Sequence, residues 1–201
     1  RVDRLEVEER TLADGTVRVA VDLMEVERAA KTLLKNGCEA VCLFFINGYA
    51  NPENEKKAAK SLRSIWPNEH VSVATEILPE IREFERCSTT TLNAYLQPPV
   101  ANYLARIEDR IKEKNKTTEI LIVQSNGGVM SIETAKSRPI KTALSGPAAG
   151  VVAAREIASA AGFNNIITGD MGGTSFDVSL VANGQNTVSY THLTLPTSND
   201  V

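Results

Sequence analysis

Residues 169–178 read GDMGGTSFDV, and this stretch decides the expected fold. The β-type run NNIIT precedes it, and its end overlaps another such run, VSLV. Apolar runs on both sides of a Gly-Gly pair predict two strands joined by a tight turn. Glycines in such a turn permit close backbone approach, so that successive N–H groups can point at an anion such as phosphate. The stretch is therefore a candidate phosphate loop.

The two aspartates beside this turn are candidate catalytic residues with different roles. Mg²⁺ prefers carboxylates together with phosphate oxygens and retained waters, so we predict that Asp170 is a metal ligand. Gly172, Gly173 and Thr174 are predicted to donate to phosphate oxygens. Asp177 is predicted to orient the loop or a water, because a second carboxylate near a polyphosphate is repelled unless a metal intervenes. The alternative is a plain hairpin turn with the aspartates as its caps.

Two further glycine loops precede this hairpin. QSNGGVMS (124–131) follows an apolar run, and LSGPAAGVVAA (144–154) leads into a helix of small residues. Pro147 suits the first turn of that helix, whose N-terminus attracts anions. Each loop alone is equally typical of a structural turn, and none is a GxxxxGK[ST] or GxGxxG motif. The candidate phosphate contacts in these loops are Ser125, Asn126, Gly127, Gly128, Ser145 and Gly146.

The composition is that of an ordinary globular protein, with 42% hydrophobic and 23% charged residues in 201. The net charge of −3 gives no basic surface for nucleic acid or an anionic membrane. No apolar stretch approaches the roughly 20 residues of a membrane span. Cys38, Cys42 and Cys87 lack CxxC spacing, and the first two are expected on one strand face. We expect all three to be buried, reduced thiols of a cytoplasmic protein.

Hydrophobic periodicity predicts alternating strands and helices along the chain. A hairpin or an edge connection is expected around the DG turn, followed by helices in 24–37 and 51–66 and strands in 39–46 and 70–78. Residues 80–115 are expected to be mostly helical with an interruption at Pro98-Pro99. A strand in 119–124, a short helix in 131–137, a loop feeding a helix that ends at Gly162, and the final hairpin follow.

Arg82 and Arg86 are four residues apart and would share one helix face. Arg86 is a candidate catalytic cation, because an arginine facing a cleft stabilises charge on a transferred phosphoryl group. The alternative is a structural ion pair. Asn93 and Ser125 are weaker candidates for contacts with substrate or nucleotide.

Five stretches, in order, resemble the hydantoinase A / 5-oxoprolinase family, which includes a related acetone carboxylase subunit. They are FINGYANPENE (45–55), LPEIREFERCSTTTLNAYL (78–96), QSNGGVMS, LSGPAAGVVAA and DMGGTSFDVSLV (170–181). The resemblance implies a partial actin-like, sugar-kinase-like (ribonuclease H-like) ATPase fold, an α/β architecture with a mixed sheet and flanking helices. It implies ATP and Mg²⁺ as cofactors, with GDMGGTSFDV as the second phosphate loop.

The resemblance also implies an ATP-dependent hydrolase that opens a cyclic amide, 5-oxoproline or a hydantoin, by phosphorylating its carbonyl oxygen. A hydantoinase B-type subunit or domain is the implied partner, and the full-length protein is expected to be an oligomer. Two alternatives stay open. One is an ATP-dependent ketone carboxylase subunit, and the other is a non-enzymatic actin- or chaperone-like ATP switch.

The matched stretches are expected to form an internal fragment of a longer protein. Residues 1–80 correspond to the end of the family's N-terminal region and 81–187 to the start of its ATPase-like domain. Residues 188–201 are expected to be a non-native tail, because VSYTHLTLPT back-translates into a sequencing adapter. The family's first phosphate loop would lie upstream of Arg1, so the chain alone is expected to be inactive. Asn54 stands where many relatives carry His, and Cys87 where Thr is common.

Overall fold

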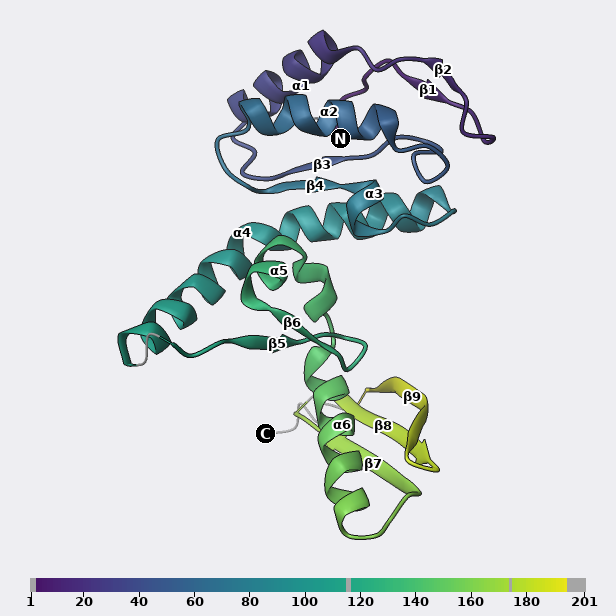
Figure 1. The fold of residues 1–201 in the computed structure, drawn as a ribbon, viewed down its shortest axis with the longest axis vertical. Helices are drawn as coiled ribbons and strands as arrows, with labels where there is room; N and C mark the ends of the chain where they lie inside the picture. The colour runs from purple at the N-terminus through teal and green to yellow at the C-terminus, as the bar shows by residue number, and fades with distance from the viewer. Residues whose placement is uncertain (1–2, 115–116, 174, 195–201) are drawn as a thin grey trace, which may run out of the picture. The chain divides into compact units, whose positions relative to one another are not determined.

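The chain divides into two compact units (Figure 1). The structure is a computed structural model that describes residues 3–114, 117–173 and 175–194. Unit 1 comprises Arg1–Ile120 and Ile132–Ile140, and unit 2 comprises Leu121–Ser131 and Lys141–Val201. The border expected between residues 80 and 81 lies within unit 1, and it stays a prediction. Both units combine helices with small sheets, which confirms the α/β class.

Unit 1 is built on a short parallel sheet covered by helices on both sides. Strands β3 (Val41–Leu43) and β4 (Val71–Val73) pair in parallel. Helix α2 (Glu53–Ile65) packs against β4 and against α1 (Leu23–Lys35), while the long helix α4 (Glu83–Lys114) covers the other side (Figure 1). The apolar core lies between these layers and includes Trp66.

The remaining elements of unit 1 are short. Strands β1 (Arg10–Thr11) and β2 (Val17–Val19) form the antiparallel hairpin expected around the DG turn. Helix α3 (Ala74–Ile77) follows β4 directly, so the strand expected in 70–78 is wrong after Val73. Helix α5 (Ile132–Ser137) packs against α4, and the 3₁₀ helix η1 (Pro139–Thr142) follows it, with its last two residues in unit 2.

Helix α4 runs through Pro98 and Pro99 without the expected interruption. A proline inside a helix removes a hydrogen bond to the carbonyl four residues back, which costs about 3 kcal/mol in an isolated helix. The packing of α4 against β3, β4 and α5 offsets that cost. Tertiary contacts therefore override the local signal. No helix in the described ranges is both long and apolar enough to cross a bilayer.

The expectation of three buried cysteines is wrong. All three are free thiols; Cys38 is half-buried, Cys42 is half-buried within β3, and Cys87 is exposed on α4. Because β3 has only three residues, Cys38 precedes the strand and the alternation expected to join it to Cys42 does not apply.

Glu108 of α4 accepts hydrogen bonds from two lysines, one on its own helix and one on α5. Its partners are Lys112, and Lys136 with Nζ 2.6 Å from Oε2; Lys136 also pairs with Glu133 at 2.9 Å. The hydrogen bond from Lys112, followed by that from Lys136, lowers the pKa of Glu108 to about 2 from its ordinary 4.5. This cluster ties α4 to α5 as long as Glu108 is ionised.

We expect the Glu108→Gln variant to be less stable than the parent protein at pH 7, with a difference that shrinks as the solution is acidified. Because the pKa of Glu108 is depressed in the folded state, its contribution is complete above pH 4.5 and is lost as the pH falls through about 2. Urea midpoints measured at pH 7 and pH 3 check this. Glu113→Gln on the same helix is the control, and a difference for Glu108→Gln that is equal at both pH values would contradict the prediction.

In its described residues, unit 2 contains two antiparallel sheets and one α-helix. Strands β5 (Leu121–Val123) and β6 (Val129–Ser131) form a hairpin around SNGG; the strand before this turn was expected, and the strand after it was not. Strands β7 (Ile166–Met171), β8 (Ser175–Ala182) and β9 (Gln185–Thr194) follow one another in a three-stranded sheet. Helix α6 (Ser145–Ala160) packs against β7 and β8 (Figure 1). The helix begins at Ser145, so SGPAAG forms its first turns instead of a loop before it.

Candidate functional site

The predicted strand–turn–strand at GDMGGTSFDV is confirmed, and it sets Asp170 and Asp177 directly opposite each other on β7 and β8. Directly opposite residues point to the same face of the sheet, with Cβ atoms about 4.5 to 5.5 Å apart. Asp170 is exposed and Asp177 is half-buried. Within the described ranges neither carboxylate has an ion-pair partner, and no three acidic, His or Cys side chains are placed so that they could hold a metal ion. The two carboxylates therefore form an uncompensated like-charge pair.

The described glycines of this turn are open to solvent. Gly172 and Gly173 are exposed, and a side chain at Gly173 would meet no atom within 4 Å. Thr174 lies outside the described residues. Behind the turn, the ring of Phe176 lies against Gly169, where a Cβ atom would come within 3.1 Å of it. A side chain at Gly169 would therefore push this ring away.

The N-terminus of α6 has no side-chain cap. Leu144 occupies the N-cap position with φ of +60°, a left-handed conformation that costs a non-glycine residue about 1 to 3 kcal/mol. The N–H groups of Ser145 and Gly146 belong to the first turn, where a helix offers no internal acceptor, and Pro147 has no N–H. Two backbone donors therefore stand at the positive end of the helix dipole.

The hairpin and the start of α6 lie at the same end of unit 2. Helix α6 is about 24 Å long, and β7 returns alongside it for about 20 Å after a short turn. The two elements pack against each other, as Figure 1 shows. Asp170 is near the end of β7 and Ser145 begins α6, so the returning strand brings the dicarboxylate toward the free N–H groups.

The SNGG turn is already hydrogen-bonded within the protein. The N–H groups of Ser125, Gly127 and Gly128 donate to the carbonyl of Lys141 at 2.8 Å, to the carbonyl of Gln124 at 3.0 Å and to the side chain of Asn126 at 2.9 Å. The hydroxyl of Ser125 donates to the same Lys141 carbonyl at 2.7 Å. These contacts favour the structural-turn alternative, and the phosphate role of residues 125–128 stays a prediction.

Arg86 is buried in unit 1. Its Nη2 lies 3.2 Å from Oε1 of Glu55, and its Nη1 donates to the carbonyl of Phe45 at 3.3 Å. Both side chains of the ion pair are fully buried, and the guanidinium carbon lies 5.0 Å from the ring centre of Phe44. The structure thus pairs Arg86 with Glu55, as expected if Arg86 has the structural role that was the alternative to a catalytic one. The catalytic assignment of Arg86 stays a prediction.

Glu55 and Gly48 complete this cluster, and neither was predicted from the sequence to belong to a site. The two carboxylate oxygens of Glu55 also accept hydrogen bonds from the N–H groups of Phe45 at 2.8 Å and Thr75 at 2.9 Å. A Cβ atom at Gly48 would lie 2.7 Å from Glu55 Oε1 and 3.0 Å from Arg86 Nη2, so glycine is required there. One signal was available, because Glu55 lies on the same helical stripe as the apolar residues Ala58, Ala59 and Leu62.

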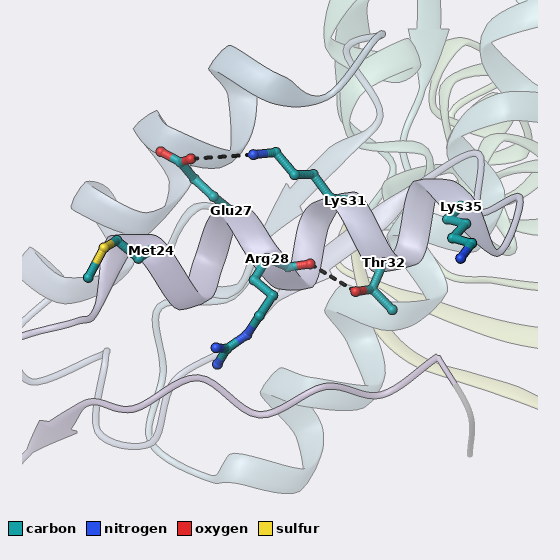
Figure 2. Close-up of a pocket in the computed structure, with 6 residues that line it drawn as sticks. All are labelled: Met24, Glu27, Arg28, Lys31, Thr32 and Lys35. Carbon is teal, nitrogen blue, oxygen red and sulfur yellow. Dashed lines mark hydrogen bonds and ion pairs between the residues drawn. The ribbon is translucent and has the colours of Figure 1, made fainter.

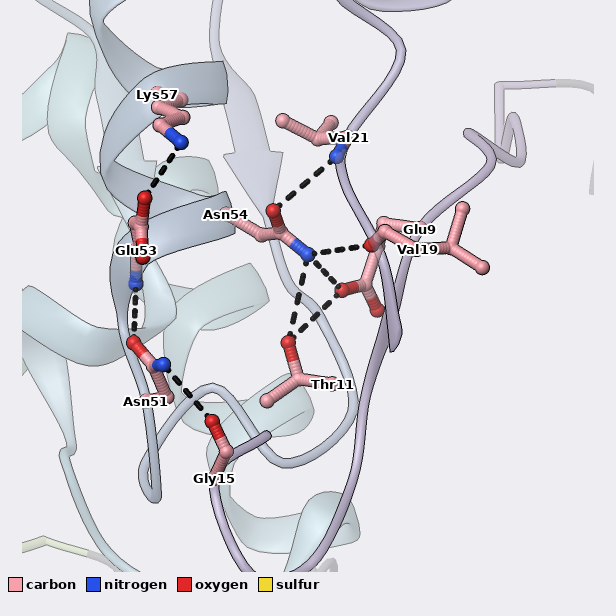
Figure 3. A network of polar contacts seen from close by, with 9 residues as sticks. All are labelled: Glu9, Thr11, Gly15, Val19, Val21, Asn51, Glu53, Asn54 and Lys57. Carbon is pink, nitrogen blue, oxygen red and sulfur yellow. Dashed lines mark hydrogen bonds and ion pairs between the residues drawn. The ribbon is translucent and has the colours of Figure 1, made fainter. Parts of the chain in front are cut away.

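Asn54, where many relatives are expected to carry His, links α2 to the β1–β2 hairpin (Figure 3). Its Nδ2 donates to a carboxylate oxygen of Glu9 at 2.8 Å and to the carbonyl of Val19 at 3.1 Å. Its Oδ1 accepts from the N–H of Val21 at 3.1 Å. The side chain is fully buried, so its role is to fix the hairpin.

Asn93 is also engaged inside unit 1. Its Nδ2 donates to Ser72 Oγ at 2.9 Å and to the carbonyl of Ser137 at 3.1 Å, and its Oδ1 accepts from the N–H of Ile140 at 3.2 Å. Gln97 donates to the same Ser137 carbonyl at 3.0 Å. These bonds hold the end of α5 against α4 and β4, and they occupy the groups that a substrate would need.

A shallow hollow of about 420 Å³ lies on the outer face of α1 (Figure 2). Its lining comes from one helix face, and Lys31 pairs with Glu27 at 3.9 Å across it. Thr32 donates its hydroxyl hydrogen bond to the carbonyl of Arg28 at 2.9 Å. With no second element contributing groups, the hollow is the solvated face of an amphipathic helix.

Two family profiles match the chain. The one described as Hydantoinase/oxoprolinase covers residues 86–198, more than half of the chain, and the Hydantoinase/oxoprolinase N-terminal region covers residues 1–66. The chain belongs to the hydantoinase/oxoprolinase family. The border expected between residues 80 and 81 falls in the gap between the two matched ranges. The larger matched range ends at residue 198, inside the segment 188–201 that was expected to be a non-native tail.

Several members of the hydantoinase/oxoprolinase family are similar to the chain. The caprolactamase subunit alpha of Pseudomonas jessenii is 33% identical over 90% of this chain and 26% of its own length. The 5-oxoprolinase of Saccharomyces cerevisiae is 32% identical over 82% of this chain and 12% of its own. The chain thus spans about a quarter or less of these relatives.

Two solved structures share the fold. The ATP-dependent caprolactamase of Pseudomonas jessenii aligns with a TM-score of 0.77 and 34% identity, covering 87% of this chain and 25% of its own. The nucleotide-free acetone carboxylase aligns with a TM-score of 0.75 and 28% identity, covering 89% of this chain and 26% of its own. Both structures are described as those of ATP-dependent systems.

Proposed function

We propose that this chain is part of an ATP-dependent enzyme that opens a cyclic amide, and that unit 2 carries one half of its phosphate site. Two relatives are named for lactams, 5-oxoproline and caprolactam, and one of their structures is described as ATP-dependent. The observation that carries the proposal is the like-charge pair Asp170 and Asp177, held opposite each other beside an open Gly-Gly turn. A cation is the natural partner for such a pair.

The donor set fits Mg²⁺ bound together with a nucleotide. Two carboxylates alone leave most positions of an octahedral ion to phosphate oxygens and waters, which is how Mg²⁺ is commonly bound beside ATP. Asp170 would hold the ion, and Asp177 would orient the loop or a water. Mg²⁺ in this position would neutralise negative charge on the phosphates. The N–H groups of Gly172, Gly173, Thr174, Ser145 and Gly146 are the proposed phosphate donors.

The proposed chemistry follows from the poor reactivity of an amide. Its carbonyl is a weak electrophile and its nitrogen a poor leaving group, so attack by water is slow. Transfer of a phosphoryl group to the carbonyl oxygen makes that carbon more electrophilic and permits ring opening. Backbone donors at the hairpin and at the start of α6 would stabilise charge that develops on the transferred group.

Larger features of the whole protein are proposed on the same basis. We propose that residues 81–187 are the start of an actin-like ATPase domain, and that the other phosphate loop lies elsewhere in the full-length protein. A partner of the B type is proposed, because relatives are named as alpha, beta and gamma subunits. We propose a cytoplasmic oligomer. A ketone carboxylase subunit is the second candidate, favoured by the structural similarity to acetone carboxylase.

The test is substrate-stimulated ATP hydrolysis by the full-length protein with its partner subunit. Phosphate release is measured with 5-oxoproline, hydantoin and caprolactam, and separately with acetone plus bicarbonate. We expect at least one cyclic amide to stimulate hydrolysis and to be consumed in proportion to it. If acetone with bicarbonate stimulates ATP hydrolysis and no cyclic amide does, the protein is a ketone carboxylase subunit instead. If none of these compounds stimulates hydrolysis, both candidate functions are contradicted. The 201-residue chain alone is expected to be inactive.

A further inference from the structure

Three cysteines of unit 1 line a single cavity of about 540 Å³. Its walls come from α1, β3, α4 and the segment before the first hairpin, and most of the lining is apolar. Cys38 and Cys42 enter the lining from the region of β3, whereas Cys87 enters from α4. The cavity therefore brings together thiols that are far apart in the sequence.

The hydroxyl of Thr91 connects two of these cysteines. Its oxygen lies 3.7 Å from the sulfur of Cys42 and donates a hydrogen bond to the carbonyl of Cys87 at 2.7 Å. Thr91 is one helical turn beyond Cys87 on α4, so both face β3 from the same side of the helix. Helix α4 packs directly on β3. Cys42 and Cys87 are thus neighbours across the α4–β3 contact.

The two thiols differ in accessibility. Cys87 is exposed and can meet a reagent from solvent, whereas Cys42 is half-buried in the cavity wall. Burial is the main cause that raises the pKa of the Cys42 thiol to about 11; the hydrogen bond from Thr91 lowers this pKa, and Cys87 and Glu55 raise it. Cys42 is consequently protected from direct attack, and Cys87 is the group that reacts first.

We propose that Cys87 and Cys42 are a modification site. The two thiols form a disulfide bond with each other by exchange with a small disulfide such as oxidised glutathione. The thiolate of Cys87 attacks one sulfur of the reagent, whose S–S bond breaks and releases one glutathione thiolate. Cys42, after losing its proton to solvent, attacks the Cys87 sulfur of this mixed disulfide and releases the second glutathione. Two protein thiols are oxidised and one glutathione disulfide is reduced to two thiols. The new bond fastens α4 to β3.

The test treats the folded chain with oxidised glutathione and follows the intact mass and the number of free thiols. We expect a mixed disulfide first and then a product lighter than the parent by two hydrogen atoms, with one free thiol left, that of Cys38. Peptide mapping should give a linked pair containing Cys42 and Cys87. The thermal midpoint of the oxidised protein should rise and return to its starting value after reduction.

Matched variants separate this outcome from general thiol reactivity. Cys38→Ser should cross-link as the parent protein does. Cys87→Ser should give no cross-link and no rise in thermal midpoint, and Cys42→Ala should stop at the stable mixed disulfide on Cys87. Circular dichroism establishes that each variant is folded. A lasting glutathione adduct on Cys87 in the parent protein, a linkage through Cys38, or no reaction at all would overturn the proposal.

Discussion

We expect the Arg86→Met substitution to lower the free energy of unfolding of unit 1 by about 3 to 5 kcal/mol. The substitution leaves the carboxylate of Glu55 fully buried without its cation. The hydrogen bonds from the N–H groups of Phe45 and Thr75 remain, and they compensate only part of the charge. Urea denaturation followed by tryptophan fluorescence measures the effect, because Trp66 is the only tryptophan of the chain and lies in the core of this unit.

Two further variants make this prediction specific. Arg82→Met removes an exposed arginine that lies 3.6 Å from Glu85, and we expect a change of at most about 1 kcal/mol. The double variant Glu55→Gln with Arg86→Met removes both charges, so no buried charge is left unpaired. Its loss of unfolding free energy should therefore be smaller than the sum of the losses in the two single variants, each of which leaves one buried charge without a partner. An Arg86→Met variant as stable as Arg82→Met would show that the buried pair does not hold unit 1 together.

The sequence predicted most of the elements because their signals are local. Each of these signals depends on residues close together in the chain: the apolar stripe of α1, the Asn51-Pro52 start of α2, the DG and SNGG turns and the β7–β8 hairpin. Errors arose where distant packing decided the outcome. Helix α4 continues through Pro98 and Pro99 because other elements support it, and β4 stops at Val73 because Ala74 begins a helix.

The site was predicted less completely than the fold. Spacing alone indicated that Asp170 and Asp177 flank a turn, and the register of β7 and β8 then set them opposite each other. The Arg86–Glu55 pair joins residues 31 positions apart, which no local pattern reveals. The hydrogen bonds of the SNGG turn depend on Lys141, a residue outside the motif. Whether the N–H groups of a glycine loop are available to a ligand therefore depends on hydrogen-bond partners that lie outside the loop's own motif.

The Asp170→Asn substitution should have opposite effects on stability and on activity. In the full-length protein we expect ATP turnover to fall by about 100-fold, because a metal ligand is lost. In this chain we expect the β7–β8 hairpin to gain about 0.2 to 1 kcal/mol, since the substitution removes the repulsion between directly opposite carboxylates. A residue that only capped a turn would show the reverse, a less stable hairpin with little change in turnover.

Hydrogen exchange of the β7 and β8 amides measures the stability effect locally, and phosphate release by the full-length protein measures turnover. Asp177→Asn is the matched variant, because it removes the same repulsion and should protect the hairpin equally. Its loss of turnover should be smaller than that of Asp170→Asn, because Asp177 is assigned to orienting the loop or a water. Unchanged turnover for Asp170→Asn would remove it from the metal site. Faster exchange in both variants would mean that the aspartates stabilise the turn, and that no cation is needed to hold them together.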